Sequence, residues 1–191
     1  MTARTHDAFA FTSLVTVATI FPPDQINLYT FFACIIGNIT GALIPDLDDQ
    51  GNRLWDLMPA GNLFGKIFRR IFYKHRTISH SLLGMCLVYK FFEWLLPKIL
   101  NPEFIDPTLL LYSIMIGFVS HLVVDALTKD GIPLFFPFKP NIGFPPFEAL
   151  RVRTGSWVEN FVVMPSLGVY FIWFISNHTE QIKILLESIK T

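Results

Sequence analysis

Three carboxylates, Asp46, Asp48 and Asp49, directly follow an apolar run over residues 28–44 that has no formal charge. A carboxylate beside hydrocarbon is costly unless it is protonated, paired with a positive group or bound to a cation. Four histidines elsewhere in the chain are available to share such a cation: His6, His75, His80 and His121. Oxygen and imidazole ligands without thiolates suit zinc, manganese or another borderline divalent ion. The residue types therefore predict a divalent-metal site, and we expect one or two zinc ions.

The sharpest local motif is His121-Leu-Val-Val-Asp125, at the end of the longest apolar segment. A spacing of four residues puts the imidazole and the carboxylate on one face of a helix, near enough to share a metal ion. A hydrogen-bonded pair that braces a helix bundle explains the same spacing. The motif alone leaves both interpretations open.

A second cluster is His75-Arg-Thr-Ile-Ser-His80. An interval of five residues does not place both rings on one helical face, so we expect His75 in a loop or first turn and His80 inside the helix. Arg76 suits a phosphate oxygen or a neighbouring carboxylate, because its guanidinium is fork-shaped and always charged. A positive anchor on the cytoplasmic side is the alternative role for Arg76.

The stretch Thr154-Gly-Ser-Trp-Val-Glu159 precedes the last apolar segment. Ser156 and Glu159 have the S-x-x-E spacing of a capping box, which is the interpretation we favour. A functional alternative is an anion site made by Arg151, Arg153 and the free amides of the helix start. Glu159 could also reach the metal.

The elements that must position these residues are apolar helices. The chain of 191 residues is 52% hydrophobic and only 16% charged, against about 25% charged in a typical soluble domain. Five apolar segments stand out, over residues 8–21, 28–44, 82–96, 107–127 and 161–176. A span needs roughly 20 residues, so the first and third could instead be buried or interfacial helices. We expect one all-α domain over residues 1–191, a multi-pass bundle of about four to five transmembrane spans.

The distribution of lysine and arginine predicts the orientation of this bundle. These residues concentrate in the connections over 45–81 and 128–160 and are nearly absent from the other two. Because cytoplasmic loops are rich in Lys and Arg, five spans place the N-terminus and both basic connections in the cytoplasm. All the candidate ligands then lie at one membrane face, which predicts a cytoplasmic site.

Two further stretches favour contact with lipid. Residues 63–74 alternate apolar and basic faces at helical spacing, which predicts a basic amphipathic helix in the headgroup plane. An ordinary surface helix is the alternative. Residues 132–146 are rich in Phe and Pro, which favours an irregular loop that enters the interface and guides a lipid substrate. A packed lid without substrate contact explains the loop equally well.

The ordered set of motifs resembles a bacterial inner-membrane family of LexA-regulated, metal-dependent hydrolases, the YdjM-like proteins. The resemblance rests on Thr5-His6, Gly41-x-x-x-Pro-Asp-Leu-Asp48, His75-Arg-x-x-x-His-Ser81, Gly117-x-x-x-His-x-x-x-Asp125 and Thr154-Gly-Ser-x-x-Glu159. It implies a multi-pass helical hydrolase, distantly similar to zinc-dependent phospholipase C and the P1-type nucleases. Carried over by motif, the metal ligands would be His6, Asp46, His80, His121 and Asp125. His75 would be a further ligand or a general acid or base.

Together these features predict a membrane-bound hydrolase that uses a metal-activated water on a phosphoester, for example that of a lipid. Asp48 or His75 would accept the proton of that water, and Arg76 or Arg153 would stabilise the developing charge. The zero net charge gives no indication of nucleic-acid binding. The alternative is a non-catalytic membrane protein with a structural metal site, an ion-transfer route or a scaffold role. Polar residues at mid-membrane depth are few, which argues against transport.

Overall fold

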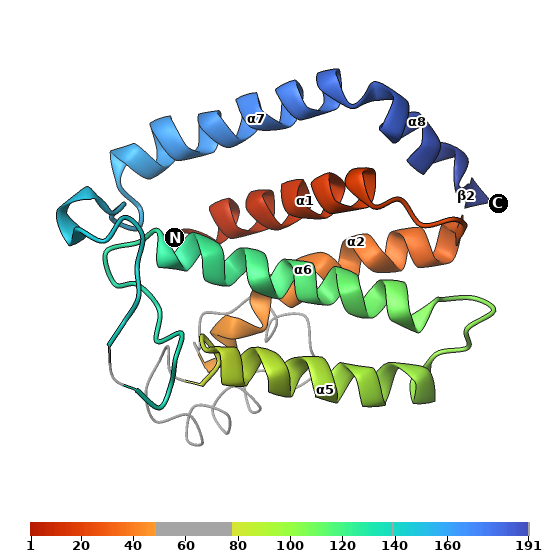
Figure 1. Cartoon of the computed structure of the whole chain (residues 1–191), viewed down its shortest axis with the longest axis horizontal. Helices are drawn as coiled ribbons and strands as arrows, with labels where there is room; N and C mark the ends of the chain where they lie inside the picture. The colour runs from red at the N-terminus through yellow and green to blue at the C-terminus, as the bar shows by residue number, and fades with distance from the viewer. Residues whose placement is uncertain (49–77, 139, 191) are drawn as a thin grey trace.

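The computed structural model describes residues 1–48, 78–138 and 140–190, and it is helical apart from one very short pair of strands (Figure 1). Its helices are α1 Ala3–Ile20, α2 Leu28–Leu43, α5 Leu82–Ile99, α6 Pro107–Ala126, α7 Met164–Asn177 and α8 Thr179–Glu187. Shorter helical turns are η1 Pro45–Asp48, η2 Glu148–Leu150 and the π-helical η3 Glu159–Val163. The all-α prediction is confirmed. The predicted helix over 63–74, with Asp49, His75 and Arg76, lies outside the described residues.

Polar side chains at the helix starts explain where several of these helices begin. Asn27 accepts a hydrogen bond from the Thr30 amide ahead of α2, and Ser81 accepts one from the Gly84 amide ahead of α5. Asp106 accepts from two amides of the first turn of α6. Each cap satisfies amides that have no partner inside the helix. The Ser81 cap also corrects the prediction that His80 lies inside the helix, because His80 precedes the cap.

Helices α2 and α6 form the centre of the molecule and touch through glycines. A Cβ atom at Gly41 would overlap the carbonyl oxygen of Ile114, and one at Gly117 would overlap the carbonyl oxygen of Asn38. Small residues at helix interfaces let two backbones approach closely. The buried core continues around this contact with Phe118 and Leu122 of α6. The glycine contacts bring the end of α2 beside the end of α6.

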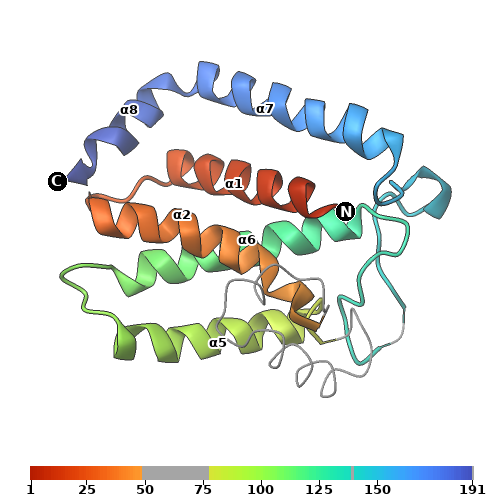
Figure 2. The same ribbon diagram turned by 180° about the vertical axis from the view of Figure 1, so that it is seen from behind.

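The remaining helices lie on either side of this pair (Figures 1 and 2). Helix α5 packs along one side of α6, and α1 packs against α2 and α6 on the other. Helices α7 and α8 run over the outside of α1. The chain closes with a parallel pair between β1 Ile26–Asn27 and β2 Ile189–Lys190. These contacts place the starts of α1 and α5 at the same end of the molecule as the end of α6.

Two stretches of the described chain are long and apolar enough to cross a membrane: Pro107–Ala126, and Glu159–Asn177, which joins η3 and α7. Helix α2 is apolar but only 16 residues long. The prediction of four to five spans is therefore supported for two segments.

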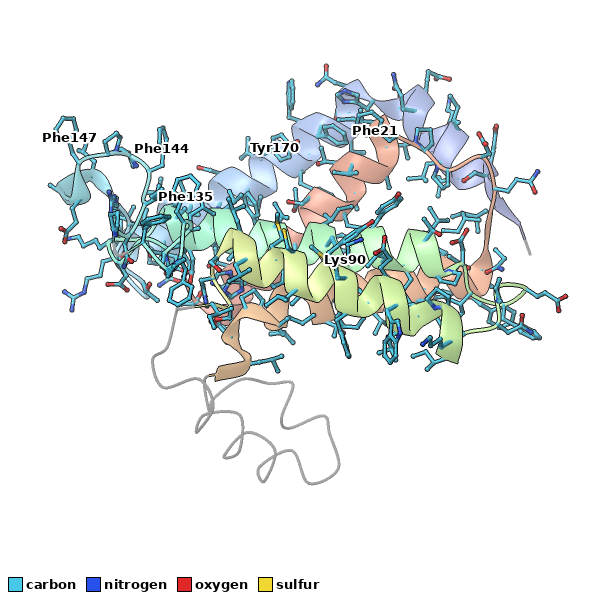
Figure 3. All side chains as sticks on the ribbon, turned by 60° about the horizontal axis from the view of Figure 1, so that its bottom comes forward. Phe21, Lys90, Phe135, Phe144, Phe147 and Tyr170 are labelled. Atoms are coloured by element: carbon cyan, nitrogen blue, oxygen red, sulfur yellow. The ribbon has the colours of Figure 1, made fainter. Side chains whose placement is uncertain are left out.

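The Phe- and Pro-rich connection after α6 is irregular, as predicted. One isolated antiparallel bridge joins Ile132 and Ile142, and the phenyl rings on either side of it project outward (Figure 3). Phe135 is 52% exposed and Phe144 is 65% exposed. These rings are available to contact a membrane interface at the end of the molecule where α6 ends.

Candidate metal centre

Five of the predicted ligands come together at that end of the bundle, although they come from four separate parts of the chain. His6 belongs to the first turns of α1, and Asp46 to η1 just after α2. His80 lies in the turn before α5, and both His121 and Asp125 belong to the last turns of α6. All except Asp46 are buried. Convergence from four segments makes a local bracing pair an incomplete explanation of the His121–Asp125 motif.

Four nitrogen-to-oxygen distances in this cluster are close to those between the ligands of a zinc ion. His80 Nε2 lies 3.4 Å from Asp46 Oδ1 and 3.5 Å from Asp125 Oδ2. His121 Nε2 lies 3.5 Å and 3.7 Å from the same two oxygens. Bonds of about 2.0 to 2.2 Å to a tetrahedral zinc ion imply ligand-to-ligand distances of roughly 3.3 to 3.6 Å. The nitrogen-to-oxygen distances are therefore close to those of a zinc shell, and Asp46, His80 and His121 form one group of possible ligands.

The orientation of the His121 ring favours a cation at this point. Its Nδ1 lies 2.6 Å from the carbonyl oxygen of Ala42, a group in the last turn of α2. Because a carbonyl only accepts, Nδ1 carries the proton, and Nε2 of the neutral ring presents a lone pair. That lone pair faces two carboxylate oxygens, and Nε2 has no hydrogen-bond partner within the described residues. A metal ion or an added proton removes this conflict. The same carbonyl contact orients metal-binding histidines in general.

Asp46 is the open side of the cluster. Its side chain is 33% exposed, whereas those of His80, His121 and Asp125 are at most 1% exposed. Partial burial acts to raise the pKa of Asp46, but the neighbouring imidazoles of His121 and His80 outweigh it and hold the pKa well below its ordinary value. Asp46 is therefore an ionised oxygen donor at neutral pH.

His6 lies on the other side of His121. The two rings are stacked, with centroids 3.9 Å apart and planes inclined by 12°. His6 Nε2 lies 3.3 Å from Asp125 Oδ1, the carboxylate oxygen other than the one near His80 and His121. The α-amino group of Met1 donates to the same oxygen at 2.7 Å. His6, His121 and Asp125 thus make a second group of possible ligands, in which Asp125 could bridge two ions.

Other predicted site residues are placed differently. Asp48 belongs to η1, but its side chain lies outside the description, so its role stays a prediction. Glu159 does not join the cluster. It binds Thr2, Thr5 and Gly155 instead, and its amide donates weakly to Ser156 Oγ at 3.4 Å. The capping box is therefore partial, because the Glu159 carboxylate caps the Gly155 amide and not that of Ser156.

Arg151, a residue of the predicted anion site, has a structural role. Its guanidinium donates to the carbonyl oxygens of Pro145 and Pro146, at 2.8 and 3.0 Å. These bonds hold the Phe- and Pro-rich connection against the segment that leads to η3.

Sequence patterns did not indicate the carbonyl of Ala42, the hydroxyl of Ser79 or the amino group of Met1, each of which contacts a cluster residue. The carbonyl and the amino group carry no signal in residue type, and a serine beside a histidine has many other uses, so only the fold could reveal these contacts.

Comparison with known proteins places this geometry in a family context. The profile of a family described as YdjM inner membrane protein matches residues 1–181. The chain is similar to the uncharacterized protein YvsG of Bacillus subtilis, with 29% identity over 85% of this chain and 88% of the relative. It is also similar to the inner membrane protein YdjM of Escherichia coli, with 26% identity over 95% of this chain and 86% of the relative. No solved structure gives a significant match.

Proposed function

Because the chain belongs to the YdjM inner membrane protein family, we propose that its His and Asp cluster makes it a membrane-bound, metal-dependent hydrolase. The observation that carries the proposal is that His80 Nε2 and His121 Nε2 each lie 3.4 to 3.7 Å from an oxygen of Asp46 and an oxygen of Asp125. His80, His121, Asp46 and Asp125 would hold the ion, with His6 as a further ligand. A bound zinc ion supplies Lewis acidity and lowers the pKa of a coordinated water toward about 7.

The residues of the chain have separable roles in this proposal. His121 is fixed by the carbonyl of Ala42, so its Nε2 is held toward the donor oxygens without a cost in reorganisation. Asp46 is partly open to solvent, whereas the side chains of His80, His121 and Asp125 are buried. Water and substrate would therefore enter on the side of Asp46. Asp48 or His75 would accept the proton of the attacking water, and Arg76 would stabilise charge on the substrate.

A phosphoester on a membrane lipid is the substrate that the surroundings favour. The sequence motifs imply a distant similarity to phosphoester hydrolases such as zinc-dependent phospholipase C, and exposed phenyl rings lie at the cluster end of the molecule. An apolar groove of about 890 Å³ also runs between α1, α2 and α6. Along α6 it extends from Leu109 to Val123, about 21 Å at 1.5 Å per residue, and one leaflet of the hydrocarbon core is about 15 Å thick. We propose that an acyl chain occupies it while the phosphate meets the cluster from the cytoplasmic side.

The test is metal analysis and phosphoester hydrolysis by the detergent-purified protein, with His121→Ala and Asp125→Ala variants. We expect a stoichiometric divalent metal that falls below about a tenth of an equivalent in either variant, together with loss of turnover. The matched control is His178→Ala, because His178 packs on Phe174 at the far end of α7. Equal and negligible turnover in the wild type and both variants, with added zinc, would reject the hydrolase.

A structural metal site is the second candidate, and the deep burial of His80, His121 and Asp125 favours it. In that case the protein retains metal, hydrolyses none of the phosphoesters tested, and loses thermal stability when a chelator removes the ion. Chelation without any change in the unfolding temperature would contradict this alternative.

A further inference from the structure

Glu159 is a completely buried carboxylate at the start of the α7 segment. Its Oε1 accepts three hydrogen bonds from the beginning of the chain: from the Thr2 amide at 2.6 Å, the Thr2 hydroxyl at 2.8 Å and the Thr5 hydroxyl at 2.6 Å. Its Oε2 accepts from the Gly155 amide at 2.7 Å. Among the described residues, no lysine or arginine forms an ion pair with it. The charge is therefore stabilised chiefly by the first turn of α1.

The first turn of α1 needs such a partner. Its capping residue, Thr2, makes no side-chain hydrogen bond to an amide of its own helix, and the turn contains no acidic residue. The start of an 18-residue helix has unpaired amides and a partial positive charge, both of which favour a nearby carboxylate. Glu159 supplies that carboxylate from a different helix. It also opens a π-helical turn, Glu159–Val163, a geometry frequent at functional sites.

The bonds to Glu159 end one residue before the candidate metal centre. Thr5, which is itself fully buried, is followed by His6, whose ring stacks on His121 and whose Nε2 faces Asp125. A rigid helical turn transmits position from one residue to the next, because neighbouring backbone dihedrals are fixed together. Holding Thr2 and Thr5 thus fixes the direction in which His6 enters the cluster.

We propose that Glu159 is a positioning residue for His6: it holds the first turn of α1 so that the imidazole stays beside Asp125 and His121. The proposal rests on the proposed function only where a metal ion is the readout. Glu159 does not touch the reacting centre, and its contribution passes through His6. Losing such an outer partner typically weakens metal binding by about 10- to 100-fold.

The first experiment is a double-mutant cycle on zinc affinity in the full-length, detergent-purified protein. Glu159→Gln keeps the shape but places an amide nitrogen among groups that donate hydrogen bonds. We expect it to raise the zinc Kd about 10- to 100-fold, and to add nothing further in a His6→Ala background. An unchanged Kd in Glu159→Gln overturns the proposal. So does an equal loss of affinity with and without His6, because a general structural role would act in both.

The matched control is Glu148→Gln, which makes the same change at an exposed glutamate of η2 and should leave zinc affinity unchanged. If Glu159→Gln does not fold, Thr5→Val removes one of the bonds without changing the shape. It should weaken zinc binding, whereas Thr5→Ser, which restores the hydroxyl, should return the affinity to the wild-type value. Failure of Thr5→Ser to rescue would contradict a role for the hydroxyl.

A second measurement separates this proposal from the metal itself. His6 is 4% exposed, so diethyl pyrocarbonate should label it slowly in the metal-free wild type, as read by mass spectrometry. Faster labelling of His6 in Glu159→Gln and Thr5→Val, but not in Glu148→Gln, supports the proposal even if the wild type binds no zinc. A wild type that binds no zinc would overturn the proposed function but not the positioning role of Glu159. Unchanged labelling of His6 in both variants overturns the positioning role.

Discussion

Helix α6 and the segment of η3 and α7 are both long and apolar enough to cross a membrane, but they lie in different surroundings. In α6, 61% of the most apolar stretch is buried inside the protein, against 11% in the other segment. Helix α6 packs on α2 through backbone contacts at Gly117 and carries two residues of the candidate metal centre. Helix α7 presents Ile172 and Trp173 outward. Apolar composition thus occurs here in two settings, a protein core and an outward-facing helix surface.

The sharpest test of this difference compares one glycine in each helix. Gly117→Ala should destabilise the protein by about 3 kcal/mol or more, because the added Cβ meets the backbone of α2, which cannot rotate away. Gly168→Ala in α7 meets no atom within 4 Å, so it should be neutral or stabilise by up to about 1 kcal/mol through helix propensity. Thermal unfolding in detergent measures both. Equal effects would remove the distinction between the helices.

Truncation of a large side chain should separate the two helices nearly as well. Phe118→Ala leaves a cavity at a fully buried position of α6 and should lower the free energy of unfolding by about 3 to 5 kcal/mol. Ile172→Ala, at a side chain that is 69% exposed on α7, should cost less than about 1 kcal/mol. Chemical unfolding monitored by tryptophan fluorescence reports both values. A cost above 2 kcal/mol at Ile172 would mean that α7 packs against protein.

A charge on the outward face of α7 tests whether lipid covers it. Ile172→Lys should oppose membrane insertion by roughly 2.5 to 3.5 kcal/mol, the cost of a lysine near the centre of a span. Ile184→Lys is the control, because Ile184 is also exposed but lies in α8, beyond the span. The fraction of protein recovered in washed membranes measures insertion. Normal insertion of Ile172→Lys would place the outer face of α7 in water.

The smallest effect is expected from a single hydrogen bond between helices. The Asn38 side chain of α2 donates to the carbonyl oxygen of Ser113 in α6 at 3.2 Å. Asn38→Ala should cost about 0.6 to 1.7 kcal/mol, the range for such bonds in membrane proteins. Ser176→Ala removes a bond within α7 to the carbonyl of Ile172 and should stay within about 0.5 kcal/mol. A larger effect at Ser176 than at Asn38 would reverse the expected order.

Helix positions were predictable where apolar residues alone define them. The segment predicted over 107–127 is observed as Pro107–Ala126, and the one over 28–44 as Leu28–Leu43. Helix α1 begins five residues before its predicted start, because Glu159 stabilises its polar first turn from a distance. Helix α8, Thr179–Glu187, was not predicted, since it is short and rich in polar residues.

The convergence of the five candidate ligands could be predicted without knowing a single contact, because successive helix ends alternate between two faces. These ligands are His6, Asp46, His80, His121 and Asp125. The groups that contact their side chains could not be predicted in this way. The carbonyl of Ala42 orients His121 only because Gly41 and Gly117 let two backbones meet, and glycine in an apolar run has many other uses. Metal binding by the five residues stays a prediction.

The short pairing of β1 with β2 gives the α7 segment a second attachment, at the end of the molecule away from Glu159. Between these attachments the chain runs first through the 19 residues Glu159–Asn177 and then through α8, Thr179–Glu187. The 19 residues extend about 28 Å at 1.5 Å per residue, close to the roughly 30 Å of a hydrocarbon core. If this segment spans the bilayer, its two ends, at Glu159 and at the start of α8, would lie near the headgroups, where water can complete their hydrogen bonding. Bilayer thickness would therefore be matched by the spacing between two anchors, and the helix between them could change its sequence freely as long as it stayed apolar.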